Sequence, residues 1–208
     1  MNYRLLVLLS GCGMYDGSDP HETILGQYFA QKHGFEVTCV APEGTSLHVM
    51  SHVSGQSLSD EGYDLQEMSS RLVKGKLLKI EEVPARFADA LFIPGGQGVI
   101  KNLLGGLGGE AHAGALALVR EVADRKRPIL AVSLAELLVN RATGVPLGKG
   151  CFDFPADAVY EEEGRNIFLT PGFTTAHSLA EAAAGIEQMF ELGRKALESG
   201  GMVLPVKS

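Results

Sequence analysis

The segment Arg127–Val139, RPILAVSLAELLV, decides how the whole chain is interpreted. The apolar run Ile129–Val132 is typical of a buried strand, and the Leu, Ala and Glu residues after it are typical of a helix. Because no Gly or Pro separates them, the strand is predicted to turn directly into the helix at Ser133. Such a turn lifts its residue above the sheet, where the following N–H groups and the helix N-terminus face a bound group. Ser133 therefore holds a position at which a nucleophile is often found.

Ser133 also has a simpler interpretation. Serine is a preferred N-cap residue, and Glu136 follows three positions later, as in a capping box. The local sequence by itself favours this capping role over a catalytic one. The choice depends on what the other strand ends carry.

Length and composition indicate one domain over residues 1–208, with residues 200–208 as a tail. The chain has 208 residues, of which 45% are hydrophobic, enough to bury a full core. The net charge of −7 and the absence of a basic cluster argue against nucleic acid as a partner. No apolar run approaches the roughly 20 residues of a membrane span, and Met1–Ser10 lacks a signal-peptide cleavage site. We expect no membrane partner and a cytoplasmic location.

The cysteines and histidines do not form a metal-binding pattern. Cys12, Cys39 and Cys151 are an odd, widely spaced set without CxxC, which argues against disulfides and structural zinc. His48 and His52 are four residues apart, but they fall in an apparent hairpin and lack a third ligand nearby. We therefore expect reduced thiols and no metal.

Strands alternate with helices along the chain, which predicts a mostly parallel sheet with helices on both faces. The predicted strands are Arg4–Ser10, Phe35–Ala41, Ala90–Ile93, Ile129–Val132 and a hairpin formed by 158–160 and 167–169. Predicted helices begin at Asp19, Leu65, Ala113, Ser133 and Ser178, and Pro42–Asp60 is predicted to form a small hairpin outside the sheet. The first helix is expected to bury Ile24, Leu25, Tyr28 and Phe29, and the last Leu179, Ala182, Ala183, Ile186, Met189 and Phe190. Between Gly98 and Gly114 we expect a glycine-rich loop.

Three strand ends have unusual sequences: Ser10–Gly13, Pro94–Gly98 and Ser133. Ligands of such sheets bind at the carboxyl ends of the strands, so we expect these three to meet around a small-molecule pocket. The glycines of Pro94–Gly98 allow close backbone approach to a ligand. Since they match no dinucleotide or phosphate-loop pattern, we predict no nucleotide cofactor.

The segment Ser10–Glu22, SGCGMYDGSDPHE, resembles the opening of the ElbB-type branch of the ThiJ/PfpI superfamily, which is class I glutamine amidotransferase-like. Members of this branch are labelled isoprenoid-biosynthesis or enhancing-lycopene proteins. Further matching segments are Ala41–Pro42, Asn102–Leu103, Thr170–Pro171 and Ala180–Ile186. A pattern of this length is far rarer by chance than a short motif.

The resemblance implies a flavodoxin-like three-layer sandwich, commonly a homodimer, with a nucleophilic cysteine at the elbow. It also implies a glyoxalase-type activity that converts dicarbonyl compounds to hydroxy acids without glutathione or another cofactor. By position, Ser133 takes the place of the cysteine and Glu22 that of the assisting acid or base. The same comparison gives an oxyanion and substrate-binding set of Gly95, Gly96, Leu134, Gly11 and Asn102.

Two departures from the family pattern affect the chemistry. Serine replaces cysteine at position 133, and serine needs a positioned base, most often histidine, to lose its proton. None of the six histidines follows Ser133 closely, although His21, His112 or His177 could fold back toward it. In addition, the segment Asn140–Phe154 is shorter than the family's usual insert after the elbow helix.

Other residues keep open roles. Cys12, between two glycines at a strand end, is the alternative nucleophile, whereas Cys39 inside a strand is expected to fill the core. Glu22 fits a capping box with Asp19, or it faces the pocket with a raised pKa.

Two functional hypotheses follow, and a third is weaker. The chain is a small-molecule enzyme of the glyoxalase or a related hydrolase kind, or it is a non-catalytic relative that keeps the pocket for binding or regulation. A glutaminase subunit would need the missing cysteine and a histidine–glutamate pair.

Overall fold

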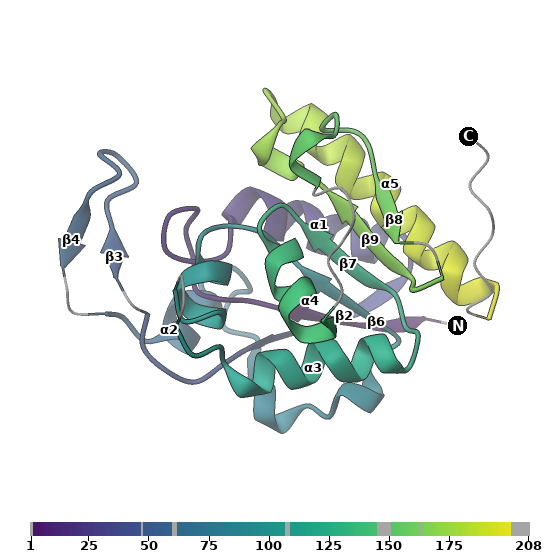
Figure 1. Ribbon diagram of the computed structural model, residues 1–208, viewed down its shortest axis with the longest axis horizontal. Helices are drawn as coiled ribbons and strands as arrows, with labels where there is room; N and C mark the ends of the chain where they lie inside the picture. The colour runs from purple at the N-terminus through teal and green to yellow at the C-terminus, as the bar shows by residue number, and fades with distance from the viewer. Residues whose placement is uncertain are drawn as a thin grey trace.

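The computed structural model describes residues 2–46, 48–59, 62–106, 109–144, 151–162 and 164–200. Seven strands form one sheet in the order β5-β2-β1-β6-β7-β9-β8 (Figure 1). They are β1 (Tyr3–Leu8), β2 (Phe35–Ala41), β5 (Leu77–Lys79), β6 (Ala90–Ile93), β7 (Ile129–Val132), β8 (Tyr160–Glu162) and β9 (Ile167–Thr170). Neighbouring strands are parallel except β8 and β9, which form the predicted antiparallel hairpin.

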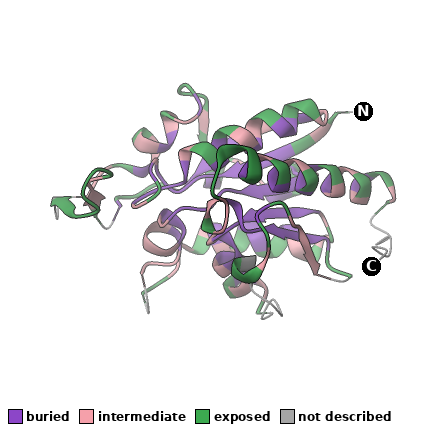
Figure 2. Cartoon of the chain, turned by 90° about the horizontal axis from the view of Figure 1, so that it is seen from above, coloured by how far each residue is buried: buried purple, intermediate pink, exposed green. Residues whose placement is uncertain are grey.

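Helices cover both faces of this sheet, as predicted (Figure 1). α1 (Pro20–Lys32) and α5 (Leu179–Glu198) pack on one face, and α3 (Ala113–Asp124) and α4 (Ala135–Thr143) pack on the other. Successive side chains alternate across a strand. Along β1, Leu5 and Val7 therefore pack on the face that α1 and α5 cover, whereas Leu6 and Leu8 pack on the face that α3 and α4 cover. Figure 2 shows the strands buried between helices whose outer surfaces are exposed. The flavodoxin-like three-layer arrangement is confirmed.

Several shorter elements complete the described part of the chain. β3 (Val49–Met50) and β4 (Ser57–Ser59) form the predicted separate hairpin, which projects from one side of the molecule (Figure 1). The others are α2 (Leu65–Ser70), the π-helix η3 (Val99–Leu103) and the 3-10 turns η1 (Ile80–Glu82), η2 (Ala85–Phe87), η4 (Cys151–Asp153) and η5 (Gly172–Thr174). No helix in this described part is long and apolar enough to cross a membrane.

Some local predictions were wrong or incomplete. The sequence analysis missed β5, which lies at the edge of the sheet. An edge strand is partly exposed, as Leu78 is at 44%, so its sequence need not be an apolar run. The predicted glycine-rich loop begins instead with η3, whose Val99 and Leu103 are completely buried. Residues 145–150 of the segment after the elbow helix and 201–208 of the tail lie outside the described residues.

The predicted apolar face of α1 was right for Phe29, which is buried, and for Leu25, which packs against the core, but wrong for its other two residues. Ile24 and Tyr28 are each 58% exposed, and the buried residues of this helix are Glu22, Thr23, Gly26, Phe29 and Ala30. Gly26 explains the orientation, since a Cβ there would lie only 2.2 Å from the Phe92 ring. In α5, Leu179 is exposed, whereas Ala182, Ile186, Met189 and Phe190 are buried as predicted.

Gly26→Ala should destabilise the protein by about 1–3 kcal/mol, because the methyl group overpacks a close helix–sheet contact. Urea unfolding of the two proteins measures this difference. Gly114→Ala in α3 is the matched control, since its Cβ would lie 3.2 Å or more from side-chain atoms and alanine favours a helix. Equal stability of the Gly26→Ala variant and the wild type would contradict the packing argument.

Candidate functional site

Four strand ends meet at the carboxyl edge of the sheet and bring the candidate residues together. The loop after β1 leads into α1, β6 ends at Pro94–Gly96, β7 ends at Ser133, and β9 leads into η5. Between them lies a cavity of about 220 Å³. Its described lining residues are Met14, Asp19, Glu22, Gly96, Gln97, Ser133, Leu134, Phe152, Phe173 and Thr174.

Ser133 sits at a strained elbow between β7 and α4. Its φ is +54°, a left-handed conformation that costs a non-glycine residue on the order of 1–3 kcal/mol. Its N–H donates to Thr170 O, and its Oγ lies 2.5 Å from Thr174 Oγ1. The N-cap position of α4 falls on Leu134, without a side-chain cap. Ser133 therefore does not act as the N-cap of this helix.

Glu22 is held between two distant backbone segments. Gly95 N–H donates to Oε2 (2.8 Å), and Phe173 N–H donates to Oε1 (3.1 Å). A Cβ at Gly95 would lie 2.7 Å from Glu22 Oε2 and 2.9 Å from Ser133 Cβ, so both side chains border this one glycine. Asp19 alone caps α1, accepting from the N–H groups of His21 and Glu22. The capping interpretation of Glu22 is replaced by a place in the pocket.

Burial controls the charge of Glu22, which is only 2% exposed. Loss of solvation, followed by repulsion from the Asp19 carboxylate, raises the pKa of Glu22 to about 8, although the two amide hydrogen bonds act in the opposite direction. Glu22 is thus mainly neutral at pH 7. Since amides approach both oxygens, its acidic proton has to point away from them.

The three predicted oxyanion amides differ in their availability. The Gly95 amide is occupied by Glu22. For the amides of Gly96 and Leu134, the described residues provide no hydrogen-bond acceptor, and both residues line the cavity. Gly96 has φ +96°, and a Cβ there would lie 2.4 Å from Gly17 O, so this position requires glycine.

The remaining candidates, Gly11, Asn102 and Cys12, are not among the described lining residues of the cavity. Gly11 N–H donates to Ser69 Oγ, and Asn102 Nδ2 donates to the carbonyls of Ser10 and Asp16. Both contacts fix the loop after β1. Cys12, in the same loop, is partly buried, and burial raises the pKa of its thiol, which disfavours the thiolate. Its role as an alternative nucleophile stays a prediction.

No histidine appears among the described lining residues. The His21 ring lies 5.4 Å from the ring of Phe173, which does line the cavity. His112 caps α3, and the His177 N–H donates to Glu181. Phe173 and Thr174 were missed in the sequence analysis, although the Thr170-Pro171-Gly172 turn after a strand marked their position.

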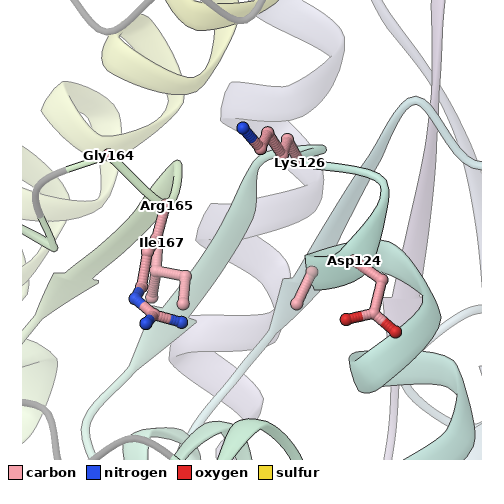
Figure 3. Close-up of a pocket in the computed structure, with 6 residues that line it drawn as sticks. Asp124, Lys126, Gly164, Arg165 and Ile167 are labelled. Atoms are coloured by element: carbon pink, nitrogen blue, oxygen red, sulfur yellow. The ribbon is translucent and has the colours of Figure 1, made fainter.

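Larger hollows lie elsewhere and carry different residues. One of about 470 Å³ is lined by Asp124, Lys126, Gly164, Arg165 and Ile167, together with Ala123. Figure 3 shows the Arg165 guanidinium and the Asp124 carboxylate reaching it from different elements. It is at the amino ends of β7 and β9, the edge opposite Ser133. Residue chemistry and position, more than volume, therefore identify the functional site.

Sequence comparison finds relatives for about half of the chain. The human glutamine amidotransferase-like class 1 domain-containing protein 3, mitochondrial, is 36% identical over 100 residues, covering 48% of this chain and 37% of that protein. The mitochondrial ES1 protein of Danio rerio is 31% identical over 106 residues, covering 49% and 39%. The matched segment thus spans about two fifths of these relatives. No family model matches the chain.

Structural comparison extends over nearly the whole chain. The crystal structure of an isoprenoid biosynthesis protein with an amidotransferase-like domain from Ehrlichia chaffeensis is 25% identical, with a TM-score of 0.85, covering 92% of this chain and 99% of that one. A ThiJ/PfpI domain protein from Brachyspira murdochii shares the fold, with a TM-score of 0.53 at 13% identity, covering 95% and 98%. The chain is therefore similar in sequence to class I glutamine amidotransferase-like proteins and shares its fold with ThiJ/PfpI domain proteins.

Proposed function

We propose that the pocket binds small neutral dicarbonyl compounds and converts them slowly to hydroxy acids, with Ser133 and Glu22 as the reacting groups. The observation that carries this proposal is the neutral, buried Glu22 carboxyl held beside Ser133 on the two sides of Gly95. A carboxyl kept neutral near pH 7 can donate a proton to a carbonyl oxygen. The strained elbow presents a hydroxyl next to it.

The proposed reaction begins when Ser133 Oγ adds to the aldehyde carbon of the substrate. Glu22 gives its proton to the carbonyl oxygen, and the serine proton leaves through the Thr174 hydroxyl to solvent. The Glu22 carboxylate then takes the C–H proton of the hemiacetal and returns it to the neighbouring carbon, while the hemiacetal hydroxyl proton passes to the former ketone oxygen, which leaves an ester on Ser133. Solvent, which received the serine proton, returns one proton to Glu22. Water hydrolyses this ester to the hydroxy acid and restores the serine.

The walls of the cavity support a small neutral substrate. Met14, Phe152 and Phe173 provide apolar surface, and the described lining residues include no Lys or Arg to pair with an anion. Besides Glu22, the one acidic residue among these described lining residues is Asp19, whose carboxylate disfavours a carboxylate or phosphate ligand. The volume of about 220 Å³ is below the usual range for drug-sized ligands.

Binding without turnover is the second candidate. It is favoured by the absence of a histidine from the described lining residues, since serine without a base is a weak nucleophile.

Ser133→Ala should abolish methylglyoxal consumption and lactate formation by the purified protein, because the hemiacetal needs the hydroxyl. Glu22→Gln should lower the rate on the order of 10²-fold, the usual contribution of a general acid or base. Ser54→Ala, in the distant hairpin turn, is the matched serine control and should retain the wild-type rate.

Two further variants, Ser133→Cys and Cys12→Ala, distinguish catalysis by Ser133 from binding without turnover and from catalysis by Cys12. If the wild type is inert while Ser133→Cys gains turnover, the pocket is intact and binding replaces catalysis as the function. If only Cys12→Ala loses activity, the nucleophile is Cys12 and the Ser133 mechanism is wrong.

A further inference from the structure

Three side chains with metal-binding atoms meet where α1 and α5 pack together, away from the Ser133 pocket. His33 is the C-cap residue of α1, whereas Glu22 lies in the first turn of that helix. Glu187 and Glu191 are one turn apart on α5, so they share one face of it. One imidazole nitrogen of His33 and one carboxylate oxygen of each glutamate all lie within 4.8 Å of one another.

The imidazole of this cluster has an unused nitrogen. His33 Nε2 is buried and finds no hydrogen-bond partner in the described part of the chain. The nearest carboxylate oxygen, Glu187 Oε1, is 3.9 Å away, which is too far for a hydrogen bond. Buried polar atoms normally have partners, so this nitrogen lacks one that a bound group would supply.

The backbone at His33 is held in place from two sides. Its N–H donates to Phe29 O, and its carbonyl accepts from Arg194 Nη1 of α5. The backbone of His33 is therefore fixed relative to α5. Glu191 is exposed and free of the packed core, so a rotation of its side chain is inexpensive.

We propose that His33, Glu187 and Glu191 form a binding site for a transition-metal ion of the Zn²⁺ class. One imidazole nitrogen with two carboxylates is a donor set that Zn²⁺ accepts, whereas Mg²⁺ and Ca²⁺ prefer oxygen ligands throughout. Ligand distances of about 2.0–2.2 Å require the three atoms to draw together from their present spacing. Water would complete the coordination, since three protein ligands leave a position open.

Lys32 competes with the metal for this site. Its ammonium lies 2.5 Å from Glu187 Oε1, and its side chain is half exposed. A bound cation has to displace this ammonium or use the other oxygen of Glu187. The interaction makes a distinctive prediction, because removing Lys32 should tighten metal binding while removing a ligand should weaken it.

Titration of the whole protein with Zn²⁺ by calorimetry, and with Co²⁺ by visible absorption, tests the proposal. We expect one equivalent to bind to the wild type and EDTA to reverse it. His33→Gln and Glu191→Gln should each weaken binding about tenfold or more, and Lys32→Gln should strengthen it. Glu198→Gln removes a charge from α5 outside the cluster, where the side chain pairs with Arg194, and should leave affinity unchanged.

The methylglyoxal assay is independent of this result, because none of these residues lines the Ser133 cavity. Binding that is insensitive to both His33→Gln and Glu191→Gln would place the metal elsewhere and overturn the proposal. So would the absence of binding by the folded wild type and Lys32→Gln proteins, with folding checked by circular dichroism.

Discussion

The wild type should be more stable than Glu22→Gln at about pH 4.5, and it should lose this advantage as the pH rises to about 8. In the unfolded chain the glutamate ionises near pH 4.5, whereas in the folded protein burial raises the pKa of Glu22 to about 8. Between these values the folded state holds a proton that the unfolded state has released. Folding stability from this group is therefore complete below about pH 4.5 and falls with rising pH, by at most about 1.4 kcal/mol per unit.

The glutamine also carries a cost that does not depend on pH. Its NH2 group cannot accept a hydrogen bond, yet the amides of Gly95 and Phe173 both point at the carboxyl of Glu22. One of these buried donors loses its acceptor, which costs about 1–3 kcal/mol. Glu22→Gln should accordingly be less stable than the wild type at pH 4.5 and more stable than the wild type at pH 8, because the stability that the wild type loses over this range exceeds the cost of about 1–3 kcal/mol.

Urea unfolding of both proteins at intervals between pH 4 and 9 measures this difference. The same change at exposed Glu36 serves as control for the loss of a surface carboxylate. A wild-type minus Glu22→Gln difference that is constant with pH would show that Glu22 is ionised throughout. The neutral carboxyl on which the proposed function rests would then be wrong.

Gly172→Ala should destabilise the protein by about 2–4 kcal/mol and disrupt the pocket. The Cβ atom would lie 2.4 Å from both Glu22 Oε1 and Val132 Cγ1, and Gly172 has φ +54°. Neither neighbour can retreat easily, because Glu22 is held by Gly95 and Val132 is fully buried. To make room for the added methyl group, the Glu22 carboxyl should move away from the Phe173 amide.

Thermal and urea unfolding measure the first effect, and the methylglyoxal assay measures the second. Gly75→Ala separates sterics from backbone strain, since Gly75 has φ +78° but no atom within 4 Å of the added Cβ. It should lose only about 1 kcal/mol. Equal losses in the two variants would mean that backbone conformation alone requires glycine at position 172.

Local rules explain why much of the fold could be predicted from the sequence. The apolar runs Ala90–Ile93 and Ile129–Val132 have no stable place outside a buried sheet, and both became central strands. Asp19 followed by Pro20 specifies a helix start, because the Asp19 side chain accepts hydrogen bonds from the N–H groups of the next residues of the helix. Rules of this kind act within a few residues, so no tertiary information is needed to apply them.

The face of α1 could not be obtained in this way. Counting apolar residues selected four positions, of which Leu25 and Phe29 contact the core and Ile24 and Tyr28 are exposed. The helix is oriented by the fit of Gly26 against the Phe92 ring and by the burial of Glu22, and both contacts involve residues far along the chain.

The sequence by itself determined the parallel sheet, the helix starts and the turn of β7 directly into α4, because each depends on neighbouring residues. Tertiary structure alone decided where Ser133 and Glu22 lie and which groups they contact. Both residues sit in sequences that equally suit helix capping, and the deciding partners are Thr174, Gly95 and Phe173 from other loops. Whether a carboxyl is a solvated cap or a buried neutral acid depends on solvent exclusion, which arises only when distant segments pack around it.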